Sequence, residues 1–307
     1  MNVSGVSEIL LLGFQNLESL NPLFFLLLLL IYCVTICGNL LIIVVVSSSR
    51  SLHSPMYFFL TQLSFSDILL TTTIVPNMLH TLLNDGSSVS ISGCLSQFYC
   101  FSASESLECL LLTVMSYDRY QAICNPLHYS SVVDLTFCLR VILCFWFVIF
   151  LMVLMIFLTL SHLDFCGPNV IDHFFCDLEP ILELSCSDTF IMKMESLVLA
   201  IVFAFCPLTI IIVSYVYIIF TILKIPSVTG RQKTFSTCSA HLTVVSLFYG
   251  SLIIIYVFPR KQNSKTILSL FYTVVTPLLN PMIYSLSNSD IKQTIKKLFY
   301  IPKSRIS

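Results

Sequence analysis

Seven long apolar segments constrain the fold of this chain more than any other feature of its sequence. A helix needs roughly 20 residues to cross the hydrocarbon core of a bilayer, which is about 30 Å thick. Backbone polar groups inside a membrane must be hydrogen-bonded within the protein, which leaves helices and closed barrels as spanning structures. Segments of this length predict seven helices, at about 23–47, 56–82, 96–120, 140–160, 196–223, 236–258 and 266–286.

The composition excludes several classes of protein. The 307 residues are 57% hydrophobic and 10% charged, with a mean hydropathy of +0.93, whereas soluble domains carry about 25% charged residues. A net charge of −1 argues against a nucleic-acid partner, because proteins that bind nucleic acids carry a basic stripe. We find no metal-ligand cluster, nucleophile elbow or phosphate-binding loop in the sequence, so we do not expect an enzyme.

The expected architecture is an all-α integral membrane bundle of one domain. We expect residues 1–22 to form an extracellular N-terminus, 23–286 the seven-helix domain, and 287–307 a cytoplasmic amphipathic helix and tail. The first apolar segment is too long for a signal peptide and no small-residue cleavage site follows it, so we expect it to be retained. In 289–300, lysines lie opposite an apolar face that suits the anionic inner leaflet. That face comprises Ile291, Ile295, Leu298 and Phe299.

Lysine and arginine are unevenly distributed between the loops, and cytoplasmic loops carry their excess in membrane proteins. Eleven of the fifteen lie in or beside 48–55, 121–139, 224–235 and the C-terminal tail. This predicts a multi-pass protein of the plasma membrane with its N-terminus outside and its C-terminus in the cytoplasm. Asn2, in the triplet NVS, then lies outside, where it is an acceptor for N-glycosylation.

The thirteen cysteines divide between two redox compartments. Those within the spans or facing the cytoplasm are expected to be reduced thiols. Cys94 at the outer end of the third span, together with Cys166, Cys176 and Cys186 in the long outer loop, allows two disulfides with three connectivities. Cys100 lies just inside the third span and is a competitor. Alternatively, Cys166 and Cys186 are free thiols.

Two acidic side chains are expected at mid-membrane, where ionisable groups are costly and usually functional. Asp67 lies in the second span and Glu108 in the third. We expect at least one to be protonated, because an isolated buried carboxylate is expensive. The pair shares a sodium ion, a proton or a water cluster, or else forms a static hydrogen-bonded network. Asn39 and Asn280 would join either arrangement.

A polar stripe runs along the outer part of the third span. Helical spacing places its residues at i, i+3, i+4 and i+7, on one face: Ser102, Glu105, Ser106 and Cys109. Leucines occupy much of the remaining surface of this helix, so the polar stripe is expected to face the bundle interior. An interior cavity lined in this way is a ligand site or an ion pathway.

The third span ends at Asp118 and Arg119, at the expected membrane boundary. There the two charges can pair at low cost, and an arginine released when helices move would make a two-state element.

Interior prolines remove backbone hydrogen bonds and kink helices, so each is either a hinge or a fixed bend. They are Pro76, Pro207, Pro277 and Pro281.

Four segments contain specific sequence motifs that a generic helix bundle does not require. They are SPMYFFLTQLSFSD (54–67), MSYDRYQAICNPLHY (115–129), KTFSTCSAHL (233–242) and TPLLNPMIYSLSN (276–288). In order along the chain they resemble the motifs of odorant (olfactory) receptors, a branch of the rhodopsin-like G-protein-coupled receptors. The form LSFSD is similar to the tetrapod class II type, which is associated with airborne odorants.

The resemblance implies a receptor that binds a small volatile odorant and activates an olfactory stimulatory heterotrimeric G protein, which raises cyclic AMP. It implies disulfides Cys94–Cys176 and Cys166–Cys186 and a mid-membrane polar site at Asp67 and Glu108. It also implies an activation switch made by Asp118, Arg119, Tyr120, Tyr215, Lys233, His241, Asn280, Pro281 and Tyr284, with Ser236 and Thr237 beside it.

By the same resemblance, the odorant pocket lies between the third, fifth and sixth helices under the long outer loop. Its implied lining is largely apolar with a few polar groups, as is usual for small-ligand sites. The hydroxyls of Tyr249 and Tyr256, seven residues apart on one helix face, can donate to a carbonyl or alcohol. The implied lining is Phe101, Ser102, Glu105, Ser106, Leu199, Phe203, Tyr249, Leu252, Ile253, Tyr256 and Thr273.

Glu105 departs from the family pattern, because the usual acid of this helix corresponds to Glu108. Glu105 is one turn nearer the outside. It is either a counter-ion that favours amine ligands or a protonated side chain bonded to Ser102, Tyr256 or water.

Three other functions are alternatives to an odorant receptor. A channel or transporter predicts inverted repeats with paired broken helices, which we do not find. A light receptor needs a Schiff-base lysine in the seventh span, and 266–286 contains none. A chemoreceptor role outside the nose stays open.

Overall fold

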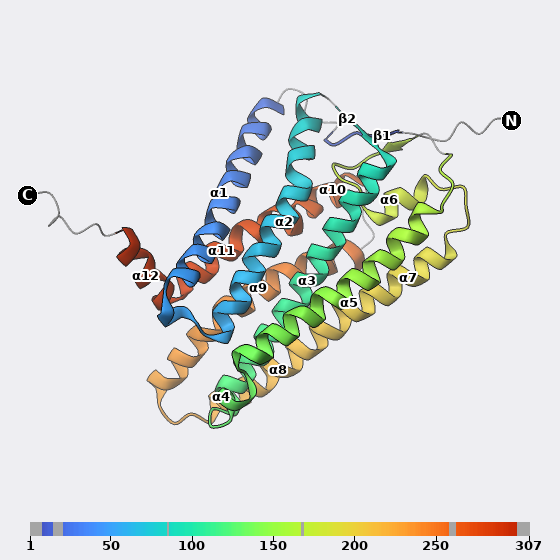
Figure 1. Cartoon of the computed structure of the whole chain (residues 1–307). Helices are drawn as coiled ribbons and strands as arrows, with labels where there is room; N and C mark the ends of the chain where they lie inside the picture. Colours follow the sequence, from blue (N-terminus) through green and yellow to red (C-terminus); the bar gives the residue numbers. More distant parts are fainter. Residues whose placement is uncertain (1–7, 15–20, 85, 167–168, 258–261, 300–307) are drawn as a thin grey trace, which may run out of the picture.

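A computed structural model describes residues 8–14, 21–84, 86–166, 169–257 and 262–299 of this chain as a bundle of long helices (Figure 1). The first four spans are α1 (Asn21–Ser48), α2 (Pro55–Leu83), α3 (Ile91–Cys124) and α5 (Leu135–Ser161). The fifth is α7 (Phe190–Ala200), η2 (Ile201–Phe205) and α8 (Cys206–Leu223), and the sixth is α9 (Val228–Val257). The seventh is α10 (Gln262–Leu270), η3 (Phe271–Val275) and α11 (Thr276–Ser287), and α12 (Ser289–Phe299) follows.

Short elements lie at the two ends of the bundle (Figure 1). The sheet end carries three strands and a short helix: β1 (Glu8–Leu11), β2 (Ser87–Ser90), β3 (Val170–Ile171) and α6 (Leu178–Glu183). The opposite end, called the α4 end below, carries η1 (Arg50–Leu52), α4 (Tyr129–Val132) and α12.

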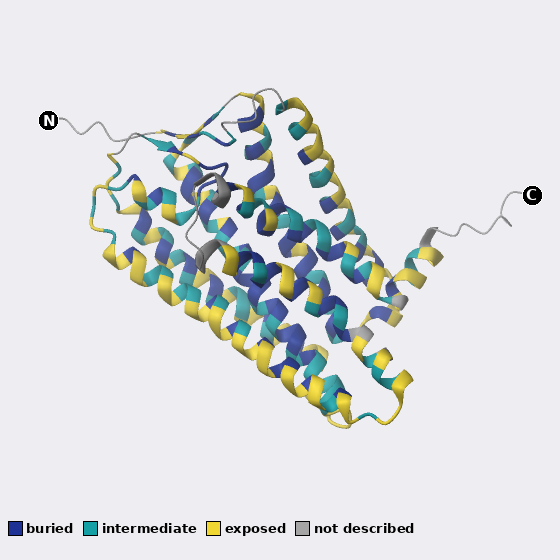
Figure 2. Ribbon diagram, turned by 180° about the vertical axis from the view of Figure 1, so that it is seen from behind, coloured by how far each residue is buried: buried dark blue, intermediate teal, exposed yellow. Residues whose placement is uncertain are grey.

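Exposed residues line the outside of the bundle (Figure 2), and many of them are large and apolar, as a lipid solvent requires. Large apolar side chains such as Leu143 (69% exposed) and Phe147 (64%) point outward, whereas soluble proteins rarely expose extensive apolar patches. Six helical spans in the described part of the chain are long and apolar enough to cross a membrane, and α9 contains the shorter apolar stretch Cys238–Ile254. The predicted helical membrane bundle is confirmed.

The fifth span begins earlier than the sequence predicted. We expected it to start at residue 196, but α7 begins at Phe190, which brings Glu195 into the span. One Glu195 oxygen accepts a hydrogen bond from Thr159 of α5 at 3.1 Å, and the other is buried without a partner among the described residues. The sequence interpretation therefore missed one intramembrane acid.

The third helix lies at the centre of the bundle, packed against α2, α5, α8 and α9. Its polar stripe faces inward as expected, but its leucines do not face lipid, since Leu107 and Leu111 are 0% exposed. This enclosure explains why α3 is less apolar than the peripheral α5. A helix surrounded by protein needs side chains that match its neighbours, and polar residues are tolerated there.

Two π-helical turns precede prolines in the fifth and seventh spans. The amide of Cys206 donates to the carbonyl of Ile201, and the amide of Thr276 donates to that of Phe271, five residues back in each case. Pro207 and Pro277 come next and have no amide hydrogen to continue an α-helical ladder. Such π-bulges are frequent at functional sites.

A three-stranded sheet at the sheet end was not predicted. Its order is β2-β1-β3, with β1 antiparallel to β2 and parallel to β3. Ile9 and Leu11 alternate inward and are at most 1% exposed, and the amide of Leu10 donates to the carbonyl of Asn169 at 2.7 Å. The N-terminal segment is thereby fixed to the long loop, residues 162–189, that joins α5 to α7.

Two disulfides hold this loop. Cys94 of α3 is bonded to Cys176, with their Cα atoms 5.5 Å apart, and Cys166 is bonded to Cys186 at 5.9 Å. Cys100 is a free thiol. These are the pairs that the family resemblance implied. Asn2, the expected glycosylation site, lies outside the described residues.

Gly13 closes the turn that follows β1, and replacing it with alanine is expected to destabilise the protein. Its φ is +66°, and a Cβ atom there would lie 2.7 Å from the Thr81 Cγ2 atom. A left-handed conformation costs an L-residue roughly 1–2 kcal/mol. Gly13→Ala should therefore lower the free energy of unfolding by about 1–3 kcal/mol once the clash is included.

Thermal unfolding of purified receptor and hydrogen exchange at β1 would measure this effect. Gly250→Ala in α9 is the matched control, because a Cβ atom there meets nothing within 4 Å and alanine favours a helix. Equal melting temperatures for Gly13→Ala and the parent would mean that the turn is not docked against α2.

Candidate functional site

The two mid-membrane acids lie on neighbouring helices at the centre of the bundle. Asp67 is 0% and Glu108 is 1% exposed, and their carboxyl groups are close enough to interact electrostatically. The side-chain amide of Asn280 donates to both Asp67 oxygens, at 3.0 and 3.1 Å. The structure thus brings together acids from α2 and α3 and an amide from α11.

Asn39 has a different role from the one expected. Its side-chain amide donates to the carbonyl of Thr35 in its own helix, at 3.1 Å, and to that of Pro277 in α11, at 3.2 Å. Asn39 therefore ties α1 to α11, and no hydrogen bond joins it to either acid within the described residues.

Several oxygen atoms at this depth are buried without hydrogen-bond partners among the described residues. They are both carboxyl oxygens of Glu108 and the amide oxygens of Asn39 and Asn280. Leaving a buried acceptor unsatisfied costs about 1–3 kcal/mol. Hard oxygen donors of this kind suit a proton, a water molecule or a small hard cation. The described residues hold no group of three or more His, Cys, Asp or Glu that could bind a metal ion.

Most of the residues implied to line the odorant pocket lie on α3, α7, η2 and α9. Phe101 packs edge-on against Phe175 of the long loop, with ring centroids 5.0 Å apart, and lies 6.1 Å from the ring of Tyr272. The residues of this region that the structure buries are Phe101, Ser106, Phe203, Tyr249 and Leu252, while Ser102, Glu105 and Leu199 are half-buried.

Ile253 does not belong to this group. Its side chain is 43% exposed, on the outward face of α9 that also carries Leu247 and Ile254. Its assignment to the pocket was wrong, because every face of a membrane helix is apolar and the pattern gives little information about which face is inside. Thr273 is buried in η3, and its hydroxyl donates to the carbonyl of Ser269 at 2.7 Å.

The side chains of four further candidates lie outside what the structure describes. They are Lys233, Ser236, Thr237 and Tyr256, all within α9.

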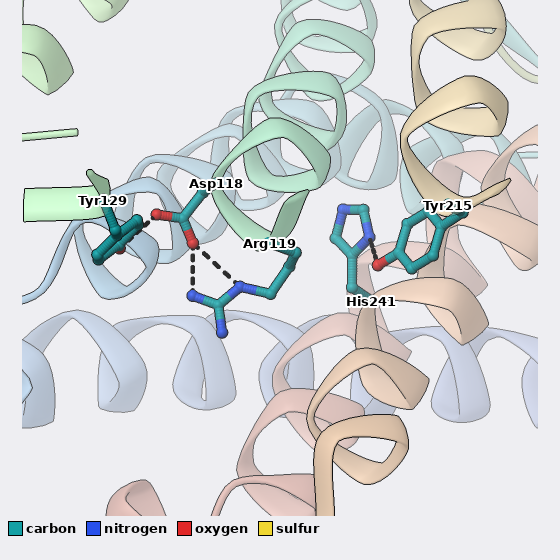
Figure 3. A network of polar contacts seen from close by, with 5 residues as sticks. All are labelled: Asp118, Arg119, Tyr129, Tyr215 and His241. Atoms are coloured by element: carbon teal, nitrogen blue, oxygen red, sulfur yellow. Dashed lines mark hydrogen bonds and ion pairs between the residues drawn. The ribbon is translucent and has the colours of Figure 1, made fainter. Parts of the chain in front are cut away.

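At the α4 end, Asp118 and Arg119 form the expected ion pair (Figure 3). The arginine Nε lies 3.0 Å from Asp118 Oδ2. The hydroxyl of Tyr129 donates to Asp118 Oδ1 at 2.7 Å. Burial, followed by the Asp118 charge, raises the pKa of Tyr129, so this hydroxyl stays a donor at neutral pH. Tyr129 was not among the predicted site residues; it lies eleven residues beyond Asp118 and is brought back by α4.

A second polar link joins three helices beside Arg119 (Figure 3). His241 of α9 is 0% exposed, and its Nε2 lies 3.0 Å from the Leu112 carbonyl of α3. A carbonyl can only accept, so Nε2 carries the hydrogen, and Nδ1 of a neutral imidazole accepts from the Tyr215 hydroxyl at 2.7 Å. His241 therefore connects α3 to α8.

The other switch candidates surround this link. Tyr120 packs edge-on against Tyr217 at 6.0 Å. Tyr284 is 1% exposed, with no hydrogen-bond partner for its hydroxyl in the described part of the chain. Pro281 lies inside α11, one residue from Asn280. The Tyr215–His241 pair joins α8 to α9, so helix movement can make or break it, whereas the Arg119–Asp118 pair lies within α3.

Comparison with known proteins gives one consistent family. A family model described as olfactory receptor matches residues 28–301. Human olfactory receptor 11L1 is 47% identical over 97% of this chain and 93% of its own length, and human olfactory receptor 6B1 is 43% identical over 99% and 98%. The crystal structure of squid rhodopsin superposes with a TM-score of 0.73 at 16% identity, covering 92% of this chain and 86% of rhodopsin; that likeness shows the fold.

Proposed function

This chain belongs to the olfactory receptor family, and from that premise we propose that it binds a small volatile odorant and activates the stimulatory olfactory G protein. It is a multi-pass membrane protein and a receptor of the G-protein-coupled class, not an enzyme. The odorant occupies the sheet-end region between α3, α7 and α9, and the activated G protein raises cyclic AMP.

The arrangement of sites along α3 carries this proposal. Glu105 in the implied pocket, Glu108 at mid-membrane and Arg119 at the α4 end lie on one continuous helix, Ile91–Cys124. The same helix supplies the Leu112 carbonyl that holds His241. A ligand that shifts α3 relative to α9 would act on the His241 link and would carry Arg119 with α3, which is the kind of helix shift that receptors use as a switch.

The disulfides support the proposed orientation. Disulfides persist in oxidising compartments, and both lie at the sheet end, with Cys94–Cys176 covering α3. Lys296 and Lys297 lie in the last turn of α12, at the other end. We therefore place the sheet end and the N-terminus outside the cell and α12 at the cytoplasmic face of the plasma membrane.

Cyclic AMP in cells that express the receptor with the olfactory G protein tests the proposal. A panel of volatile amines, esters, ketones and alcohols should include at least one agonist. Arg119→Ala at equal surface level should abolish the response, because it removes the charge paired with Asp118. A response that is the same with Arg119→Ala, or a panel that gives none in the parent, would count against the proposed coupling.

A sodium ion fits the mid-membrane site, with Asp67 and Glu108 as its charged ligands. The unpartnered oxygens of Glu108 and Asn280 support this assignment. A ligand that binds only the folded state at ten times its Kd stabilises that state by about 1.4 kcal/mol. Replacing choline chloride with sodium chloride should raise the melting temperature of the parent receptor, but not that of Glu108→Gln. Equal melting temperatures of the parent in both salts would exclude the site.

A further inference from the structure

We propose that this receptor takes protonated amines, and that Glu105 and Tyr249 together hold the ammonium group. The inference rests on the proposed function, because it specifies the class of ligand for the same pocket. Its basis is a carboxyl group on α3 and a buried hydroxyl group on α9 that interact electrostatically and that form no hydrogen bond with the described residues.

Glu105 has no hydrogen bond or ion pair with any described residue. Two acids lie near enough to Glu105 to interact with it electrostatically: Glu108, one turn along α3, and Asp177 of the long loop. The Asp177 carboxylate accepts from the amide of Leu178 at 2.7 Å and caps α6. The region around Glu105 therefore carries three acids. A carboxylate in an apolar site needs a cation or several hydrogen bonds to offset its lost hydration. The described protein supplies Glu105 with neither.

Tyr249 gives an independent indication of a ligand. Its side chain is only 4% exposed, and its hydroxyl has no hydrogen-bond partner among the described residues. The Cys109 thiol lies beside that hydroxyl, and the Glu105 carboxyl is close enough to interact with it electrostatically. A buried hydroxyl is normally satisfied, so the atom that completes this pair is expected to come from the ligand.

A primary ammonium matches both groups. It has three N–H donors, one for a Glu105 oxygen and one for the Tyr249 oxygen, and its charge compensates the carboxylate. A neutral alcohol or ketone would satisfy Tyr249 but leave Glu105 without a counter-charge. Phe101, Phe203 and Leu252 belong to the same cluster of buried apolar side chains as Tyr249, which suits a hydrocarbon tail. The predicted ligand is therefore a small amine with an apolar tail.

Ligand-dependent thermal stabilisation of purified receptor is the test, because it needs no G protein. The probes are volatile primary amines and alcohols of matched carbon skeleton. Glu105→Gln should weaken amine binding about thirtyfold or more, the loss expected when one partner of a buried charge pair is truncated. It should change alcohol binding by less than about threefold. Tyr249→Phe should weaken amines about fivefold.

Two further variants keep the test decisive. Glu105→Asp preserves the charge and should retain amine selectivity, even if Glu105→Gln folds poorly. Glu195→Gln removes an acid that contacts Thr159 at the α5–α7 boundary, and it should leave amine binding unchanged. The inference is overturned if Glu105→Gln leaves amine binding intact, or if it weakens amines and alcohols equally.

The same preparations separate this inference from the proposed function. Amines that stabilise the parent through Glu105 but raise no cyclic AMP would overturn the proposed signalling and support the ligand class. Alcohols or ketones that raise cyclic AMP, with amines that neither bind nor signal, would overturn the ligand class and support the signalling.

Discussion

Cys176→Ser is expected to remove most of the receptor from the cell surface. The bond from Cys94 to Cys176 closes a loop with a sequence separation of 82, and removing a native disulfide typically costs about 2–5 kcal/mol. Phe174 and Phe175, the two residues that precede Cys176, are 0% exposed, and Phe175 packs against Phe101 of α3. Loss of the bond would therefore release buried aromatic surface together with the covalent tie.

Surface staining of intact cells and the melting temperature of purified receptor would measure the loss. Cys100→Ser is the matched control, because Cys100 lies in the same helix as Cys94 but is a free, exposed thiol. It should reach the surface at the parental level. Normal surface expression of Cys176→Ser would show that packing and hydrogen bonds alone hold the loop.

His241→Phe is expected to lower the free energy of unfolding by about 2–4 kcal/mol and to raise basal signalling. Phenylalanine fills the site but cannot donate to the Leu112 carbonyl or accept from the Tyr215 hydroxyl. Each buried group left without a partner costs about 1–3 kcal/mol. Because the link joins α3, α8 and α9, its loss should also ease their separation.

A double-mutant cycle of His241→Phe with Tyr215→Phe isolates the link. Residues in direct contact show coupling energies of about 0.5–3 kcal/mol. Tyr217→Phe, two residues along α8 and 56% exposed, is the control and should show none. Strictly additive effects of the two buried changes, or basal cyclic AMP unchanged in His241→Phe, would contradict the role given to this contact.

The helical bundle could be predicted from the sequence because a bilayer imposes length and apolarity on each span. The sheet could not. Its strands are short, and β1 pairs with residues about eighty positions away, such as Glu8 with Ser90. Nothing local in EILL marks a strand partner at that distance. The start of the fifth span was misplaced for another reason. Lys193 and Glu195 are charged, so the first turns of this span looked like part of a loop.

The polar residues of the site were easier to predict than the apolar ones. A charged or amide side chain inside a membrane must face protein, so Asp67, Glu108 and Arg119 could be placed from their positions alone. Apolar residues carry no such constraint, because lipid tails are as apolar as the bundle interior, and Ile253 was misplaced as a result. Tyr129 could not be predicted, because its contact with Asp118 depends on the path of the chain after α3. The sequence pattern does not reveal that path.

The π turns η2 and η3 have a consequence for the evolution of this chain by insertion and deletion. A π turn holds one residue more than an α turn. Because the turn is wider, its five residues cover about the same rotation as four residues of an α-helix. Deleting Ala204 from η2 would therefore leave a continuous α-helix whose two parts keep their relative orientation, so Leu199 and Tyr215 would both keep their present neighbours. Single-residue gaps at these turns are thus positions where relatives can differ in length without repacking the bundle.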